Sequence, residues 1–147
     1  MYFEDFYQGY SFETKKKTIT KKDIISFAEK WDYQPFHIDE KLAKQSHYGG
    51  LIASGWQTIA IAHSLILDTQ KTSKCSMGSP GLDKVNWFKP VRPNDPIHCM
   101  VTVKSSRKSN SKPFGVTTIL VEVFNQEKEL VADMTAVWFL KLADSQG

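Results

Sequence analysis

The segment WDYQPFHID, residues 31–39, places an acid and an imidazole on either side of a proline. Asp32 and His37 flank a turn that contains Pro35, so both side chains can point from a constrained loop toward one spot. Such a pair can activate a water molecule, because one group withdraws a proton while the other donates one. An aspartate and a histidine around a turn are, however, more often a cap or a surface pair, and the spacing alone leaves both interpretations open.

A run of small residues, YGGLIASGW at 48–56, leads into the most apolar part of the chain. If a helix begins there, its first backbone amides have no partner within the helix and lie at the positive end of the helix dipole. The amide of Gly55, which has no side chain to block approach, could then polarise a carbonyl oxygen. Alternatively, Gly49, Gly50 and Gly55 merely permit tight turns and close packing of a helix on a sheet.

Short elements are expected to carry the Asp32/His37 segment. Thr20 followed by Asp23 resembles a capping box and predicts a helix over 21–31, which Pro35 should end because the residue before a proline avoids helical geometry. A strand is expected before this helix at 10–19, and a second short helix after it at 39–45.

The segment 51–67, LIASGWQTIAIAHSLIL, is apolar almost all round, which is typical of a helix buried inside a protein. Beyond it the pattern changes to one of strands that form an antiparallel meander. We therefore predict an α+β domain in which an antiparallel sheet wraps around one long helix. The strands are expected at 85–87, 97–103, 116–124 and 130–142.

The 147 residues carry a net charge of +3 and are 41% hydrophobic, which fits one soluble domain spanning 1–147. The basic residues are interleaved with acidic ones, so we expect no nucleic-acid binding, and Lys15–Lys17 suit a solvated strand edge. No apolar run is long enough to span a bilayer, and no membrane partner is expected. Without a signal-like start, the default compartment is the cytoplasm, with Cys75 and Cys99 reduced.

No histidine pair has zincin-like spacing, so no metal is predicted. His63, inside the apolar segment, is expected to be a core or interface residue, and His47 and His98 lie apart from the Asp32/His37 motif.

The two motifs together resemble those of the MaoC-like dehydratases, which include the (R)-specific enoyl-CoA hydratases. Their Asp-x-Asn-Pro-x-His signature corresponds here to the segment from Asp32 to His37, and the later small-residue element is Ile52-Ala53-Ser54-Gly55. The resemblance continues through the WFKPV run at 87–91. It implies a hot-dog fold, in which Asp32 and His37 hold and activate the water and the Gly55 amide binds the thioester oxygen.

Two positions depart from this pattern, since Gln34 replaces the asparagine and Ser54 stands where many hydratases have histidine. A branch of MaoC-like proteins has the Gln-Pro-Phe-His form together with a Ser-Pro-Gly loop, which Ser79-Pro80-Gly81 matches. The resemblance therefore places this chain in that branch, and the loop could close one side of the site.

The expected reaction is reversible (R)-specific hydration of a 2-enoyl thioester, with coenzyme A or acyl carrier protein entering only as part of the substrate and no cofactor. A thioesterase and a non-catalytic acyl-binding subunit are the alternatives; the intact Asp32/His37 pair favours hydration. The family forms dimers with a continuous sheet, so we expect at least a homodimer. Lys89, Arg92, Arg107 and Lys108 could meet coenzyme A phosphates or be ordinary surface residues. Residues expected to contact substrate, some of which could equally be core, are Trp31, Gln34, Phe36, Tyr48, Gly50, Ser54, Trp56, Ser79, Pro80 and Gly81.

Overall fold

The computed structural model describes residues 1–143 and contains one long helix, several short helices and six strands among them. The helices are a 3-10 turn (η1, Phe3–Asp5), α1 (Lys21–Trp31), α2 (Pro35–Ile38), α3 (Glu40–Gln45) and α4 (Gly55–Asp68). The strands are β1 (Ser11–Glu13), β2 (Lys17–Thr18), β3 (Gly81–Trp87), β4 (Pro96–Lys108), β5 (Phe114–Phe124) and β6 (Leu130–Lys141).

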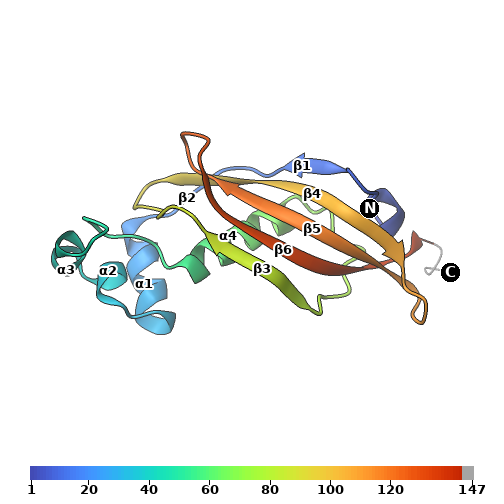
Figure 1. The fold of residues 1–147 in the computed structure, drawn as a ribbon, viewed down its shortest axis with the longest axis horizontal. Coiled ribbons are helices and arrows are strands. Elements are labelled where there is room, and N and C mark those ends of the chain that lie inside the picture. Colours follow the sequence, from blue (N-terminus) through green and yellow to red (C-terminus); the bar gives the residue numbers. More distant parts are fainter. Residues whose placement is uncertain (144–147) are drawn as a thin grey trace.

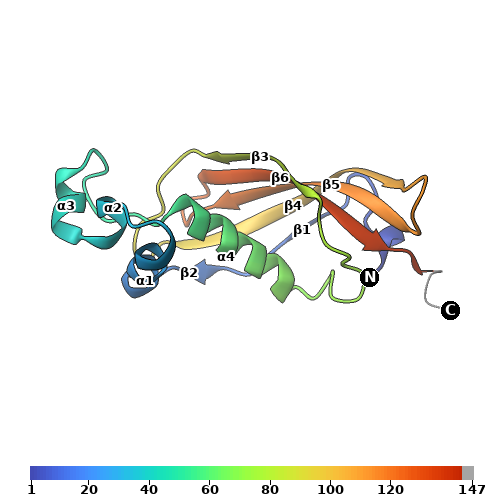
Figure 2. The same cartoon turned by 90° about the horizontal axis from the view of Figure 1, so that it is seen from below.

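The strands form one antiparallel sheet in the order β1-β4-β5-β6-β3, with β2 also paired to β4. The long helix α4 lies across one face of this sheet (Figures 1 and 2). The predicted architecture, an antiparallel sheet around one long helix with β4, β5 and β6 as a meander, is thereby confirmed.

The core lies between α4 and the sheet, and the central strand β5 shows this most clearly because its burial alternates strictly. In β5 every second residue from Gly115 to Val123 is buried, and the residues between them are only half-buried. Val121 pairs with Val101 on one side and with Met134 on the other, so one row of apolar side chains crosses three strands. Each such side chain contributes about 1.5–3 kcal/mol when it is fully removed from water.

The helix α4 differs from its prediction in two respects. It begins at Gly55, since residues 51–54 are not helical. It is also not buried all round: Ala62, Leu65 and Ile66 face the core, but a stripe at four- and three-residue spacing is exposed in this chain. The exposed stripe consists of Trp56, Ala60, His63 and Leu67.

The first part of the chain confirms the helix at 21–31 and its capping box, because the Thr20 hydroxyl accepts from the Asp23 amide. As predicted, this helix ends before Pro35, and Gln34, the residue before the proline, is extended. Pro35 is the first residue of α2, a position where its missing N–H costs nothing. The expected strand at 10–19 divides into β1 and β2, and between them Thr14 bonds to the backbone of Cys99.

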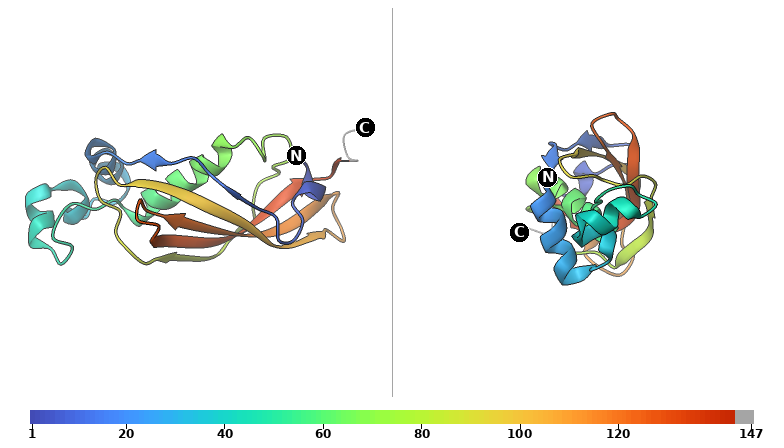
Figure 3. Two further views of the ribbon diagram at one scale, coloured as in Figure 1. Left: turned by 90° about the horizontal axis from the view of Figure 1, so that it is seen from above. Right: turned by 90° about the vertical axis from the view of Figure 1, so that its left-hand side faces the viewer.

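The short helices α1, α2 and α3 gather at one end of the molecule, beside the start of α4, while the N-terminus and the end of β6 lie at the other end (Figures 1 and 3). A buried amide links the long helix to one of the short ones, since Gln57 of α4 donates to the Asp23 carbonyl of α1 over 3.0 Å. Among residues 1–143, no helix has the length and apolar character needed to cross a membrane.

Candidate functional site

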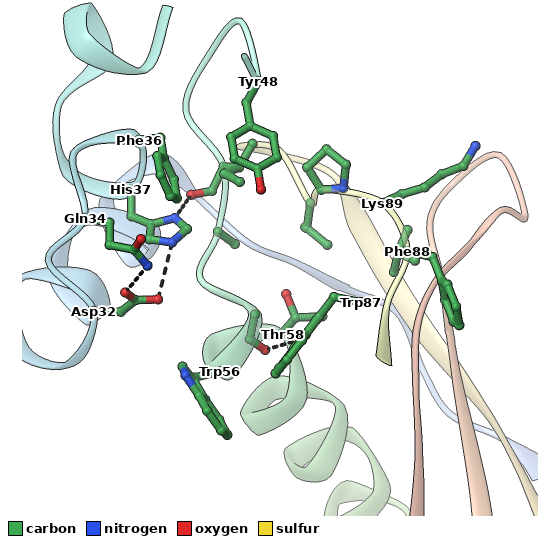
Figure 4. Close-up of a pocket in the computed structure, with 16 residues that line it drawn as sticks. Asp32, Gln34, Phe36, His37, Tyr48, Trp56, Thr58, Trp87, Phe88 and Lys89 are labelled. Carbon is green, nitrogen blue, oxygen red and sulfur yellow. Dashed lines mark hydrogen bonds and ion pairs between the residues drawn. The ribbon is translucent and has the colours of Figure 1, made fainter. Parts of the chain in front are cut away.

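Asp32 is the residue that ends α1, and its carboxylate is the most heavily bonded acid of the site. One oxygen, Oδ1, accepts the amide of Gln34 at 2.7 Å. The other, Oδ2, accepts the hydroxyl of Ser54 at 2.7 Å and lies 3.3 Å from Nε2 of His37. Three neighbours from three segments therefore fix the orientation of this carboxylate, and Figure 4 shows the contacts with Gln34 and His37.

These contacts set the charge of Asp32. Burial is the largest single influence and raises its pKa, but the hydrogen bonds from Ser54 and Gln34 and the attraction of His37 together lower it further than burial raises it. The net pKa of Asp32 lies below its ordinary value of 3.8. Asp32 is therefore a carboxylate at neutral pH.

His37 lies in α2 and is only 4% exposed. Its Nδ1 is 2.8 Å from the carbonyl oxygen of Ile52, and because a carbonyl can only accept, Nδ1 carries a hydrogen. Nε2 is then the atom that gains or loses a proton, and it faces Asp32. The ring also meets the edge of Phe36, with centroids 4.6 Å apart.

Ser54 connects the acid to the long helix. It is fully buried and caps α4, accepting the amide of Trp56 at 3.2 Å while donating to Asp32. Gly55 follows as the first residue of α4, where backbone amides have no partner within the helix. A Cβ at Gly55 would lie 2.6 Å from the indole of Trp87, which itself donates to the Gly55 carbonyl at 2.9 Å. A side chain at Gly55 would therefore require the Trp87 ring or the helix start to shift.

A cavity of about 390 Å³ opens beside these groups (Figure 4). The predicted residues that line it are Asp32, Gln34, Phe36, His37, Tyr48, Gly55 and Trp56. Ser54 lies behind the wall, bonded to Asp32. The Tyr48 ring packs on Phe36 with centroids 5.1 Å apart and continues the wall beside His37.

Besides Ser54, five residues of the predicted site lie outside the cavity lining. Trp31 is 72% exposed, and Gly50 packs beside the guanidinium of Arg92. Ser79, Pro80 and Gly81 precede or begin β3, whose other end, Trp87, is the part that lines the cavity. Six residue steps of strand separate Gly81 from Trp87, which is about 20 Å.

Other lining residues were not among the predicted site residues. Trp87 and Phe88 are large apolar side chains left 46% and 53% exposed, and Thr58 presents a hydroxyl from the second turn of α4. The WFKPV run was a signal that could have found most of them, but sequence does not tell which side of a strand end faces a cavity. The additional lining residues are Ile52, Ala53, Thr58, Trp87, Phe88, Lys89, Pro90, Val91 and Val131.

Of the four basic residues considered for phosphate contact, two lie near the cavity. Lys89 lines it and is ion-paired with Glu129 on the β5–β6 hairpin. Arg92 donates to the Tyr48 carbonyl at 2.6 Å and so holds the loop that carries this wall residue. Arg107 and Lys108 are at the far end of β4.

A second hollow, of about 500 Å³, lies on the other face of the sheet, where His98 stacks on Phe124. His98 and Met100 alternate with the buried Cys99, so they point away from α4. This hollow contains no acid and imidazole in contact, and the Asp32/His37 cavity is therefore the better candidate site.

Comparisons with known proteins agree with the geometry. Residues 6–124 match the family described as MaoC like domain. The uncharacterized protein YdeM of Bacillus subtilis is 30% identical over 128 residues, which are 87% of this chain and 90% of that protein. The 3-hydroxybutyryl-CoA dehydratase of Methylorubrum extorquens is 32% identical over 108 residues, 70% of this chain and 64% of that protein. The crystal structure of a MaoC-like dehydratase from Rhodospirillum rubrum has a TM-score of 0.88 and 31% identity, covering 96% of this chain and 97% of that one.

Proposed function

Because this chain belongs to the MaoC-like domain family, we propose that it is a lyase that reversibly hydrates a 2-enoyl thioester. The observation that carries the proposal is the contact of 3.3 Å between Asp32 Oδ2 and His37 Nε2 at the wall of a cavity. Two groups so placed can hold one water molecule between them and the substrate. The similarity to a 3-hydroxybutyryl-CoA dehydratase supports the same reaction class.

The proposed reaction is a syn addition. Water loses a proton to the pair as its oxygen bonds to C3, and the electrons of the C2=C3 bond move to the thioester oxygen as an enolate. The proton is then delivered to C2 on the same face, and the enolate collapses to the 3-hydroxyacyl thioester. No oxidant or reductant enters this balance, so we propose that the reaction needs no cofactor.

The enolate oxygen requires a hydrogen-bond donor, and the Gly55 amide is the proposed one. It begins α4, where the unpaired amides and the helix dipole favour negative charge. A donor placed on a developing oxyanion contributes about 3–4 kcal/mol in enzymes that have been tested by mutation. The absence of a side chain at Gly55 leaves room for the Trp87 ring, which packs beside the start of the helix.

The carrier would lie across the mouth, where Lys89 and Arg92 are the basic residues near the cavity. We propose coenzyme A or acyl carrier protein as the carrier and an (R)-3-hydroxyacyl thioester as the product. The acyl group would sit against Phe36, Tyr48 and Trp56.

We also propose that the working unit is at least a homodimer. The strand β3 is at the end of the sheet order, so its outer edge has no neighbour among the described residues. Leu82, Trp87 and Phe88 on or beside this strand are about half exposed, and α4 presents its exposed stripe. An open edge with apolar neighbours is usually covered by pairing. Sedimentation velocity of the purified protein tests this, and a monomer at micromolar concentration would contradict it.

The deciding experiment adds purified protein to crotonyl-CoA and to longer or branched 2-enoyl-CoAs, and follows the absorbance of the conjugated thioester. We expect wild type to remove the absorbance, and Asp32→Asn and His37→Ala to be slower by about 100-fold or more. Chiral analysis of the product tests the (R) assignment.

The same assay separates the two alternatives. Release of free thiol with the double bond intact would indicate a thioesterase. If neither the absorbance nor the free thiol changes with any substrate of the panel, and the protein binds an unreactive acyl-CoA analogue, the chain is an acyl-binding subunit. Both outcomes would contradict the proposed hydration.

A further inference from the structure

Gln34 stands at the position where the resembling signature has asparagine, and its contacts are unusual for an exposed side chain. Its Nε2 donates to Asp32 Oδ1 at 2.7 Å, and it lines the cavity. Its backbone lies between the members of the pair, since its amide donates to the Asp32 carbonyl at 2.9 Å and its carbonyl accepts from the His37 amide at 3.0 Å. A single residue thus contacts both Asp32 and His37.

The groups facing Asp32 come from three elements, and only one of them is ionisable. His37 of α2 is that group, at 3.3 Å. The start of α4 contributes the neutral hydroxyl of Ser54, and the loop contributes the neutral amide of Gln34. Each carboxylate oxygen therefore has one neutral donor, and the donors are on opposite sides of the group.

We propose that Gln34 is a positioning residue: with Ser54, it holds Asp32 as an oriented carboxylate that stays ionised during the reaction, and so makes Nε2 of His37 the atom that transfers the proton. The catalytic part of this inference rests on the proposed hydration; the effect on Asp32 does not.

The different roles of Asp32 and His37 follow from the hydrogen bonds that each side chain already makes. The two donors stabilise the charged form of Asp32, which makes it a weak base. His37 Nδ1 is held by the Ile52 carbonyl, so only Nε2 can exchange a proton with water. A proton on Nε2 is in turn stabilised by the fixed negative charge at 3.3 Å. His37 therefore takes the proton from water and returns it to C2, while Asp32 stays ionised.

The length of the side chain is part of the inference. Asparagine is shorter by one carbon–carbon bond, about 1.5 Å, and from the same backbone its amide would fall outside hydrogen-bond range of Oδ1. Replacement at this position should not unfold α2, because Gln34 caps that helix without using its side chain. Gln34→Met and Gln34→Asn are therefore suitable variants, and Gln45→Met, an exposed position in α3, is the matched control.

The first measurement needs no substrate. Protein with ¹³C-labelled aspartate carboxyls is titrated by NMR, with the Asp32 signal assigned from Asp32→Asn. We expect the pKa of Asp32 to rise in both Gln34 variants, because each loses a hydrogen bond that stabilises the charged form of the carboxylate. It should not move in Gln45→Met. An unchanged Asp32 pKa in Gln34→Met would overturn the inference, whether or not the protein is a hydratase.

The second measurement is the pH dependence of kcat/KM for hydration. Loss of the Gln34 donor makes Asp32 a stronger proton acceptor, which draws the proton onto His37 more strongly. The acidic limb of the pH profile should therefore shift to higher pH by an amount similar to the rise in the Asp32 pKa. Above that limb, kcat should fall by less than about tenfold. A uniform loss at every pH, with an unmoved limb, would mean a merely structural role and would contradict the inference. If no enoyl thioester is hydrated at all, the proposed function fails while the NMR titration still decides the role of Gln34.

Discussion

The two ends of α4 lie in very different surroundings. Toward its C-terminal half, Leu65 and Ile66 pack into a sheet whose inward side chains are almost fully buried. At its start, Gly55 lines the cavity that holds the Asp32/His37 pair and is rimmed by exposed aromatic rings, and Ser54 lies behind the wall. The buried end is held by apolar area, and the open end by a few side-chain hydrogen bonds between segments far apart in the sequence. Stability and activity should therefore depend on different residues.

The two ends of α4 also differ in the substitutions that they tolerate. A core position is defined mainly by volume, so a substitution there costs according to the cavity that it leaves. At the open end the Ser54 hydroxyl has two partners at once, and the position of Gly55 is limited by Trp87. Four substitutions test this separation.

The largest effect on stability is expected from Ile119→Ala, which removes a fully buried side chain of β5. The free energy of unfolding should fall by about 2–5 kcal/mol in urea denaturation. The folded protein should keep near wild-type kcat, because Ile119 does not line the cavity. Leu120→Ala, on the opposite, half-buried face of the same strand, is the control and should cost clearly less. Loss of kcat in folded Ile119→Ala would show that core and site are coupled.

Ser54→Ala removes both the cap of α4 and the donor to Asp32. We expect about 1–3 kcal/mol of lost stability near neutral pH. The folded pKa of Asp32 lies below its ordinary value of 3.8, so its hydrogen bonds stabilise the fold above that pH and cease to do so as the pH falls through the folded pKa. The difference from wild type should therefore shrink on acidification.

Urea titrations at pH 7 and at pH 3 measure this change. Ser64→Ala, whose hydroxyl donates to the Ile61 carbonyl in the same helix, is the matched control and should show no such pH dependence. An equal loss at both pH values in Ser54→Ala would mean that only the cap matters.

Part of the fold and of the site could be predicted from the sequence. The alternation around Ile119 predicted the strand, and apolar periodicity predicted the meander because burial on one face fixes that period. The capping box at Thr20 and the Asp32/His37 pair are local patterns, so both could also be recognised in the sequence. The chain's own sequence therefore predicted the sheet, the long helix and the chemical pair.

The features that the sequence could not predict depend on contacts between residues that are far apart in the chain. Trp87 reaches Gly55 only because β3 returns beside the start of α4, and nothing near either residue indicates it. The stripe with Trp56 and Leu67 was expected to be buried, because composition gives hydrophobicity but not how far a sheet wraps. The bond from Gln34 to Asp32 depends on the turn that α2 makes, which the prediction treated as a loop.

Gly55→Ala is expected to affect activity more than stability. Its Cβ would lie 2.6 Å from the Trp87 ring, so the ring or the helix start must shift. The strain is offset in part by the helix preference for alanine, about 0.5–1 kcal/mol, and the net change in unfolding free energy should be small. Hydration kcat/KM should fall by about tenfold or more, because the amide proposed to bind the enolate moves.

The double variant Gly55→Ala/Trp87→Leu gives the control for this prediction. It removes the ring that the new methyl group meets, so stability should recover toward that of Trp87→Leu alone. Because Trp87 lines the cavity, the activity of the double variant is compared with that of Trp87→Leu alone. The two should be equal if the displacement of the amide was the cause, and the double variant should be slower if the methyl group itself was. Unchanged kcat/KM in Gly55→Ala would contradict the proposed role of the amide.

The smallest effect is expected at Trp31, whose side chain is 72% exposed and outside the cavity lining, although its neighbour Asp32 is central. Trp31→Ala should change kcat/KM for crotonyl-CoA by less than about twofold, the range of a surface substitution of 0.5 kcal/mol. Trp87→Ala, which removes a lining ring of the same type, should raise KM clearly more. If instead Trp31→Ala raises KM as much as Trp87→Ala, the indole contacts the carrier or a second copy of the chain. The open end would then extend beyond the cavity to the last turn of α1.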